Sequence, residues 1–212
     1  TIMSLIKYND RSLRNLTTAP AAVVNPPGAL QHIKTLTASS SSTLSFVDGS
    51  DSVVLDSTYP IYRFEFINIH PSANGAEFLF QGNAVGGSGF NETITSAAVE
   101  VFHNESGDTA GISYSAYFDK AQGTSFQSIA GNPGNGNDES ISGTLTLFNP
   151  SSTTFVKHFI SKINDYNNND FSLYFPIAGY FNTTSAIDEI QFKVDTGNIE
   201  TGEIIMYGIK DS

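Results

Sequence analysis

Apolar and polar residues alternate one by one along much of the chain after residue 30, which is the pattern of half-buried β-strands. In residues 190–194 the apolar side chains fall on one face and the polar ones on the other, and residues 62–66 repeat this pattern. Ile67 and Ile69 then take the opposite parity. This switch predicts either a β-bulge or a strand that passes between two sheets.

Turn-forming clusters separate these alternating segments at intervals of about 8–12 residues, which is typical of antiparallel sandwiches and barrels. No segment keeps helical spacing of apolar residues over three turns. We therefore predict an all-β, antiparallel β-sandwich with jelly-roll connections, because a Greek-key arrangement is the usual solution at this strand number. Further strands are predicted at residues 33–36, 44–47, 53–55, 77–80, 98–103, 112–118, 126–129, 144–148, 155–160, 171–175 and 204–209.

The first 28 residues differ from the rest, with short apolar pieces that end on a Pro-Pro-Gly sequence at residues 26–28. Proline has no backbone donor for a sheet, so this sequence predicts a boundary. We expect an extended N-terminal arm over residues 1–28 and a sandwich domain over residues 29–212. The alternative is a frayed terminus. Against it, the arm holds too many apolar side chains to be left in water, Leu13 among them.

Composition narrows the function classes. The net charge is −11, with only ten Lys and Arg, which argues against binding to a phosphate backbone. No apolar run approaches the roughly 20 residues of a membrane span, and the opening residues do not read as a secretory signal. Sixteen Phe and nine Tyr supply an aromatic core without any Cys. We expect neither a nucleic-acid nor a membrane partner.

No motif for catalysis stands out. The four His do not lie in a nucleophile motif, and no His-x-x-x-His pair or Cys is available for zinc. Most acids are predicted on turns or on polar strand faces, Asp165 among those on turns. Calcium is the most plausible metal, since residues 48–51 and 135–139 place oxygen ligands on Gly-bearing loops. Ordinary turns explain both loops better, so we predict no enzyme activity and no cofactor.

Four blocks of sequence are similar to a family of virion structural proteins of tailed phages, of the marine phage type, which ends in a Tyr-Gly-Ile-Lys β-sandwich module. The blocks are residues 4–15, residues 143–150 continuing through Phe155 to 159–161, residues 179–192, and residues 197–210 with Tyr207-Gly208-Ile209-Lys210. We expect the blocks to mark the fold. Core strands are predicted from Leu145, Leu147, Phe155 and Phe159, and a closing hairpin from Ile190, Phe192, Ile205, Tyr207 and Ile209.

The resemblance implies a non-enzymatic protein on the surface of the virion, most plausibly a capsid decoration (cement) protein that docks on the major capsid protein. It implies a symmetric homo-oligomer, with a trimer favoured. The arm carries three of the ten basic residues, and we predict that docking uses Lys7, Arg11, Arg14 and Leu13.

A tail-fibre or receptor-binding protein that contacts host surface glycan is the alternative. Three long polar loops at residues 81–91, 131–140 and 164–170 are the predicted contacts. The residues proposed for them are Asn135, Asp138, Tyr166 and Tyr174. The absence of coiled-coil heptads or repeats for a fibre shaft favours the capsid shell.

Overall fold

The computed structural model describes residues 30–210, which form thirteen β-strands and no helix. The strands are β1 (Leu30–Thr37), β2 (Leu44–Val47), β3 (Ile61–Pro71), β4 (Phe78–Ala84), β5 (Ile94–Asn104), β6 (Ala110–Tyr114), β7 (Lys120–Gly123), β8 (Gln127–Ala130), β9 (Ile141–Phe148), β10 (Lys157–Asn167), β11 (Phe171–Phe181), β12 (Ile187–Val194) and β13 (Ile199–Ile209).

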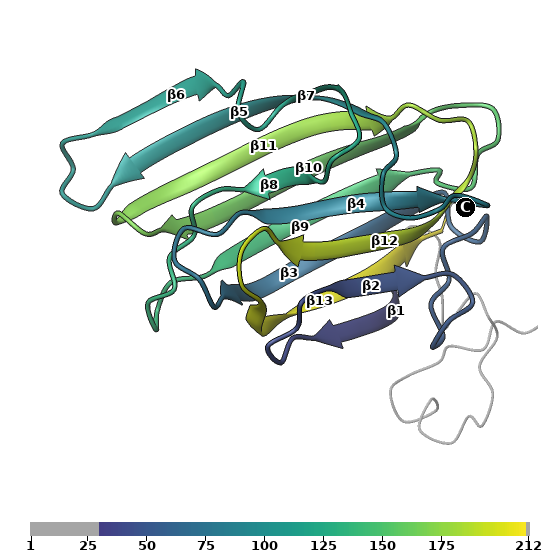
Figure 1. Cartoon of the computed structure of the whole chain (residues 1–212), viewed down its shortest axis with the longest axis horizontal. Helices are drawn as coiled ribbons and strands as arrows, with labels where there is room; N and C mark the ends of the chain where they lie inside the picture. Colours follow the sequence, from purple (N-terminus) through teal and green to yellow (C-terminus); the bar gives the residue numbers. More distant parts are fainter. Residues whose placement is uncertain (1–29, 211–212) are drawn as a thin grey trace, which may run out of the picture.

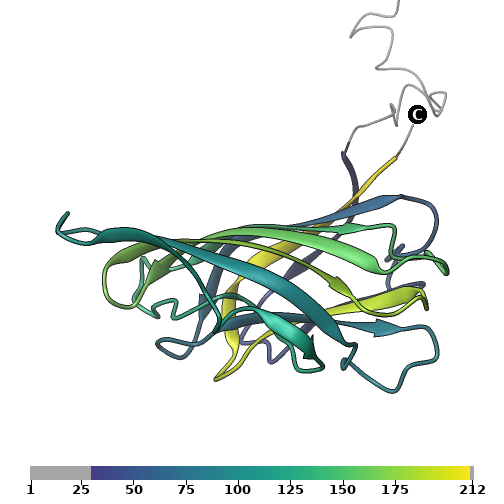
Figure 2. The same ribbon diagram turned by 90° about the horizontal axis from the view of Figure 1, so that it is seen from above.

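These strands build two antiparallel sheets packed face to face (Figures 1 and 2), so the predicted β-sandwich is confirmed. The nine-stranded sheet has the order β1-β13-β3-β9-β10-β11-β5-β6, with β7 also paired to β5. The four-stranded sheet has the order β2-β12-β4-β8. That the strands are connected as in a jelly roll remains a prediction.

The smaller sheet covers only part of the larger one, because β11, β5 and β6 extend beyond its β8 edge (Figure 1). The segment between β6 and β8 helps to cover the remaining inner face. Within it, Phe118 is buried with its ring edge-on to Phe175 of β11, at a centroid distance of 5.0 Å. The strand β7 of the same segment pairs with β5. The core therefore continues past the edge of the smaller sheet.

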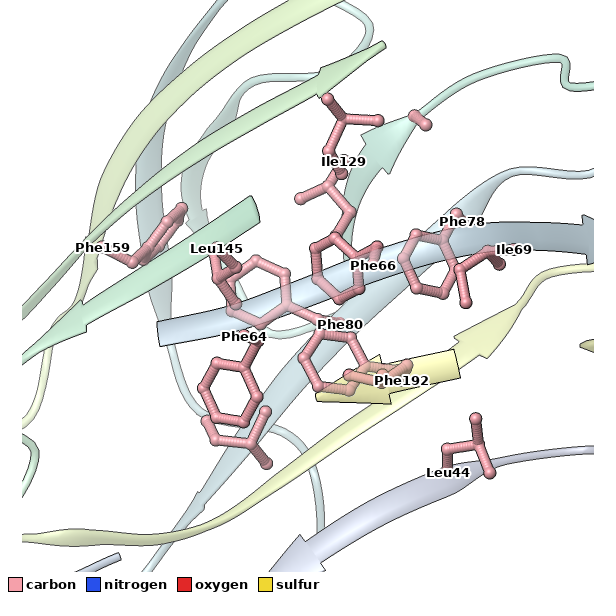
Figure 3. Packing of buried hydrophobic residues seen from close by; sticks show 14 of the residues in the cluster. Leu44, Phe64, Phe66, Ile69, Phe78, Phe80, Ile129, Leu145, Phe159 and Phe192 are labelled. Atoms are coloured by element: carbon pink, nitrogen blue, oxygen red, sulfur yellow. The ribbon is translucent and has the colours of Figure 1, made fainter. Parts of the chain in front are cut away.

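Phenylalanine rings fill the space between the sheets, as their number in the sequence predicts (Figure 3). The ring of Phe192 on β12 lies at the centre, with five other rings at centroid distances of 5.2–6.3 Å. Two of these five ring pairs meet edge to face, which aligns a ring's positive edge with its neighbour's negative face, and two are stacked. The neighbours of Phe192 are Phe46, Phe64, Phe66, Phe78 and Phe80.

The parity switch in β3 is a β-bulge, as one of the two interpretations predicts. The β3–β9 register shifts between Phe66 and Ile69, and Asn68 has a φ of 49°. The neighbouring strand β13 bulges at the same level, around Gly202 with a φ of 118°. A Cβ on Gly202 would lie 2.6 Å from the carbonyl oxygen of Asn68, so this close approach requires glycine.

Several predicted strand boundaries are wrong. Residues 53–55 form no strand, although Val53 and Leu55 are buried. Residues 81–84 belong to β4 and residues 164–167 to β10, so the loops predicted there are shorter. In each strand the backbone ladder continues through residues whose polar character suggests a loop in the sequence.

The predicted core residues need two corrections. Phe155 lies before β10 and is 69% exposed. In β13 the buried residues are Ile204 and Met206, while Ile205, Tyr207 and Ile209 lie on the opposite face. The bulges in β13 change its parity after Ile199, which reverses the faces that simple alternation predicts.

The predicted closing hairpin is also wrong, since β12 pairs in the smaller sheet and β13 in the larger one. The turn at residues 195–198 carries the chain across the sandwich. The arm, including Lys7, Arg11, Leu13 and Arg14, lies outside the described residues. Between residues 30 and 210 no helix is long and apolar enough to cross a membrane.

Candidate functional site

Two of the three predicted contact loops meet at one end of the sandwich, the end opposite the C label in Figure 1. Here the β8–β9 loop (residues 131–140) lies against the end of β10 and the β10–β11 turn. Gly134 N–H donates to the Tyr166 carbonyl (3.2 Å), and Tyr166 N–H donates to the Ser140 carbonyl (3.2 Å). Asn168 N–H donates to the Asn132 carbonyl (3.1 Å). We call this region, residues 131–140 with 165–170, the loop end.

The third predicted contact loop begins elsewhere. It follows β4, which ends on the side of the C label (Figure 1). The three loops therefore do not form one surface.

Asp165 is buried at the loop end, although the sequence predicts it on a turn. It lies in β10 beside Ile141 of β9 and Leu173 of β11, and its exposed fraction is 0%. Neither carboxyl oxygen has a hydrogen-bond partner. Burial, reinforced by the negative charge of Glu139, raises the pKa of Asp165 from 3.8 to about 8. An unpartnered buried carboxyl group is costly and rare.

Glu139 is the second carboxyl group of the loop end. The β8–β9 loop wraps its carboxylate closely: Gly136 N–H donates to Oε2, and a Cβ on Gly134 would lie 2.0 Å from the carboxyl carbon. His70 Nδ1 donates to the main-chain carbonyl of Glu139 (2.7 Å). His70 Nε2 also lies 3.6 Å from the Glu200 carboxylate. An open pocket of about 460 Å³ lies beside these groups and is rich in acids.

Of the four residues predicted for receptor contact, three lie together at the loop end. Asn135 and Asp138 are exposed in the β8–β9 loop, and Tyr166 lies close by. The Glu105 carboxylate, with desolvation and the charges of nearby acids, Asp138 among them, raises the pKa of the Tyr166 phenol to about 12. Asn135 Nδ2 is already engaged with the Ser72 carbonyl (3.3 Å).

Tyr174 lies apart from the loop tip. It is 38% exposed on β11, on the face of the larger sheet that points away from the smaller one, opposite Val101 of β5. We call that face the outer face.

Sequence reasoning missed Asp165, but a signal was present. Phe159 and Ile163 are inward residues of β10, and continuing the period of two places Asp165 on the same apolar face. The expectation that residues 164–170 form a loop concealed this. A carboxylate at an apolar position of a continuous strand indicates a functional or structural role.

The loop end offers oxygen ligands rather than a nucleophile. Within the described part of the chain, no group of three or more His, Cys, Asp or Glu is arranged to hold a metal ion. Two carboxyl groups and the main-chain carbonyls of the loop are the available donors. Such a set suits hard cations, not zinc or copper.

A second pocket, of about 400 Å³, lies along β8 on the other side of the sandwich. It combines aromatic and charged side chains: Lys193 Nζ lies 4.4 Å from the centre of the Phe126 ring, and Phe90 packs against the same ring at 6.3 Å. The Tyr117 phenol donates to Glu77 at the pocket wall. Aromatic faces next to polar groups are suited to contact with a sugar.

No family model matches the chain, and no curated protein or solved structure matches it.

Proposed function

We propose that this chain is a non-enzymatic structural protein of a tailed-phage particle, a capsid decoration protein that docks on the major capsid protein. The four blocks similar to phage virion proteins are the first support. Three of them fall in β9–β13, in strands that contribute to both sheets.

The observation that carries the proposal is the strand order. In the larger sheet β1-β13-β3-β9 are neighbours, and they face β2-β12-β4-β8 of the smaller sheet. Followed along the chain, these eight strands alternate one by one between the two sheets, except that β4 and β8 are successive members of the smaller sheet. This is the order of two Greek keys in an eight-stranded jelly roll. We infer a jelly roll in which β5–β7 and β10–β11 are insertions that widen one sheet. Jelly rolls are recurrent in viral capsid proteins.

Self-association is the second part of the proposal, with a second copy of this chain as the partner of the outer face. Large apolar side chains are exposed there, on strands β3, β6, β10 and β11 of the larger sheet: Ile67, Ile112, Tyr114, Ile160 and Tyr174. The same face carries both signs of charge, with Arg63 paired to Glu65 (3.2 Å). Two copies can therefore meet there despite the net charge of −11. We propose a trimer.

Docking is assigned to the arm, through Lys7, Arg11, Arg14 and Leu13. Basic residues are scarce in this acidic chain, and their clustering suits an acidic neighbour on the shell. Many weak contacts on one particle add up through avidity.

The test is incorporation into particles. Deleting residues 1–24 is expected to leave a folded sandwich that no longer joins virions, and the K7Q/R11Q/R14Q variant is expected to join fewer. Electron microscopy of intact virions locates the protein, and circular dichroism verifies folding. Normal incorporation of the deleted protein would refute the role of the arm, and a position on the tail would refute the decoration function.

Receptor binding is the second candidate, supported by the pocket along β8. The rings of Phe90 and Phe126 beside Lys193 provide apolar faces and charge for a host surface glycan. Binding on a glycan array at micromolar strength that disappears in F126A would favour this function. Absence of binding would favour the decoration protein.

A further inference from the structure

We propose that the loop end binds a hard divalent cation, Ca²⁺ in preference to Mg²⁺, between the carboxyl groups of Asp165 and Glu139. Main-chain carbonyl oxygens of the β8–β9 loop and water complete its coordination. This site is independent of docking and of particle assembly.

The proposal begins with the two unpartnered oxygens of Asp165. A fully buried carboxyl group normally pairs with a donor or a positive charge, because desolvation of an unpaired polar group costs several kcal/mol. Among residues 30–210, no Lys, Arg or His forms an ion pair with Asp165. A bound cation would satisfy both oxygens at once.

Glu139 provides the second half of the site. Its carboxyl group lies against Gly134, whose N–H donates to the carbonyl of Tyr166, the residue that follows Asp165. Two carboxyl groups held close to each other repel unless a cation lies between them. Glu139 is only partly buried, which leaves an approach from solvent, whereas Asp165 closes the inner side.

Local backbone geometry holds Glu139 in place. The Gly136 N–H bond and the close passage of Gly134 fix its carboxylate, and side chains at these two glycines would occupy its position. The loop itself is tied to β10 by the hydrogen bonds of Tyr166. The pair is thus preorganised on a strand and on an anchored loop.

The oxygen ligands at the loop end favour Ca²⁺ over Mg²⁺. Ca²⁺ accepts about six to eight oxygen ligands in flexible geometry, including main-chain carbonyls, while Mg²⁺ requires a near-ideal octahedron. Two acids in an irregular loop fit the first description better. With so few charged ligands, the dissociation constant is expected in the range of about 0.1–1 mM, as in extracellular calcium modules.

The test uses the full-length protein, freed of metal with EDTA and then melted with and without CaCl₂ or MgCl₂. At a Ca²⁺ concentration about 100 times the dissociation constant, the melting temperature is expected to rise by roughly 5–10 °C. Mg²⁺ is expected to shift it much less.

Three variants make the test specific. D165N is expected to lose the Ca²⁺-induced shift, and E139Q to weaken Ca²⁺ binding at least tenfold. D51N removes the same charge from an exposed position between β2 and β3, outside the loop end, and is expected to keep the full shift. If D165N does not fold, calorimetric titration of Ca²⁺ into the wild type and E139Q provides the comparison. An unchanged wild-type melting temperature in Ca²⁺, or a full shift in D165N, would overturn the proposal.

Discussion

At the scale of single residues, two ionisable side chains on the inward face of β10 have opposite environments. Lys157 is fully buried, yet its Nζ donates to the carbonyls of Phe155 (2.8 Å) and Thr183 (3.1 Å). Asp165, near the other end of the same strand, has no partner at all. Lys157 therefore fastens the loops on either side of it, whereas Asp165 destabilises the fold whenever it is charged and unligated.

The raised pKa of Asp165 predicts a pH dependence of stability in EDTA. Between pH 4 and pH 8 the folded protein retains a proton that the unfolded chain has lost, since the pKa rises from 3.8 to about 8. The unfolding free energy is then expected to fall by up to about 1.4 kcal/mol per pH unit in this window. Asp165→Asn removes this contribution. In urea unfolding at several pH values, the unfolding free energy of the variant should therefore exceed that of the wild type by more as the pH rises. Parallel pH profiles for the two proteins would contradict the assignment.

The central ring of the core gives a second prediction. Phe192→Ala is expected to lower the unfolding free energy by about 3–5 kcal/mol, because the cavity forms among five packed rings that cannot all collapse into it. Phe155→Ala is the matched control, with an expected change within about 0.5 kcal/mol, since that ring is exposed. Denaturant unfolding measures both. Equal losses would mean that the core is not centred on β12.

At the scale of elements, the paired bulges of β3 and β13 explain much of what sequence reasoning achieved and missed. The parity switch at Ile67 and Ile69 predicted either a bulge or a strand that passes between the sheets, and the structure has the bulge. The second bulge, around Gly202, was not predicted, so Ile205 was assigned to the core, where the structure has Ile204. Periodicity identifies strands well, but one inserted residue inverts every assignment beyond it.

Gly202→Ala tests this bulge pair. The substitution combines an unfavourable φ of 118° with a clash against the Asn68 carbonyl, so the unfolding free energy is expected to fall by about 3 kcal/mol. Gly107→Ala shares the positive φ, at 75°, but has open space around the new methyl group, and should lose only about 1 kcal/mol. Similar losses at both positions would show that conformation alone, and not the close approach, requires glycine.

The loop end was only partly predictable for a different reason. Asn, Gly and Asp in residues 131–140 indicate a turn. The contact of this loop with β10, however, depends on the order of the strands in the sheet, which a local sequence pattern does not determine. Sequence parity does place Asp165 on an inward face once β10 is known to continue to Asn167. Its lack of a partner depends on side chains from three strands and cannot be found from spacing.

At the scale of the whole molecule, the two sheets are unequal. Nine strands face four, and the excess strands β11, β5 and β6 form a twisted extension (Figure 2). Its inner face is covered by the segment around Phe118, but the outer face has no cover within the described residues. A monomer gains nothing from apolar side chains there, whereas an assembly would bury them.

The outer face therefore yields the prediction that distinguishes a scaffold from a free monomer. Ile112 is 72% exposed and Tyr174 is its near neighbour across Val101 of β5. The double substitution Ile112→Ser with Tyr174→Ser is expected to shift the full-length protein from oligomer to monomer in light scattering. The melting temperature of the monomer should change little, because these two side chains contribute to the contact between copies and not to the core. Tyr117→Ser, which alters an exposed ring beside the β8 pocket, should leave the oligomer intact. A wild type that is monomeric at high concentration, or a double variant that still associates, would place the partner contact elsewhere on the molecule.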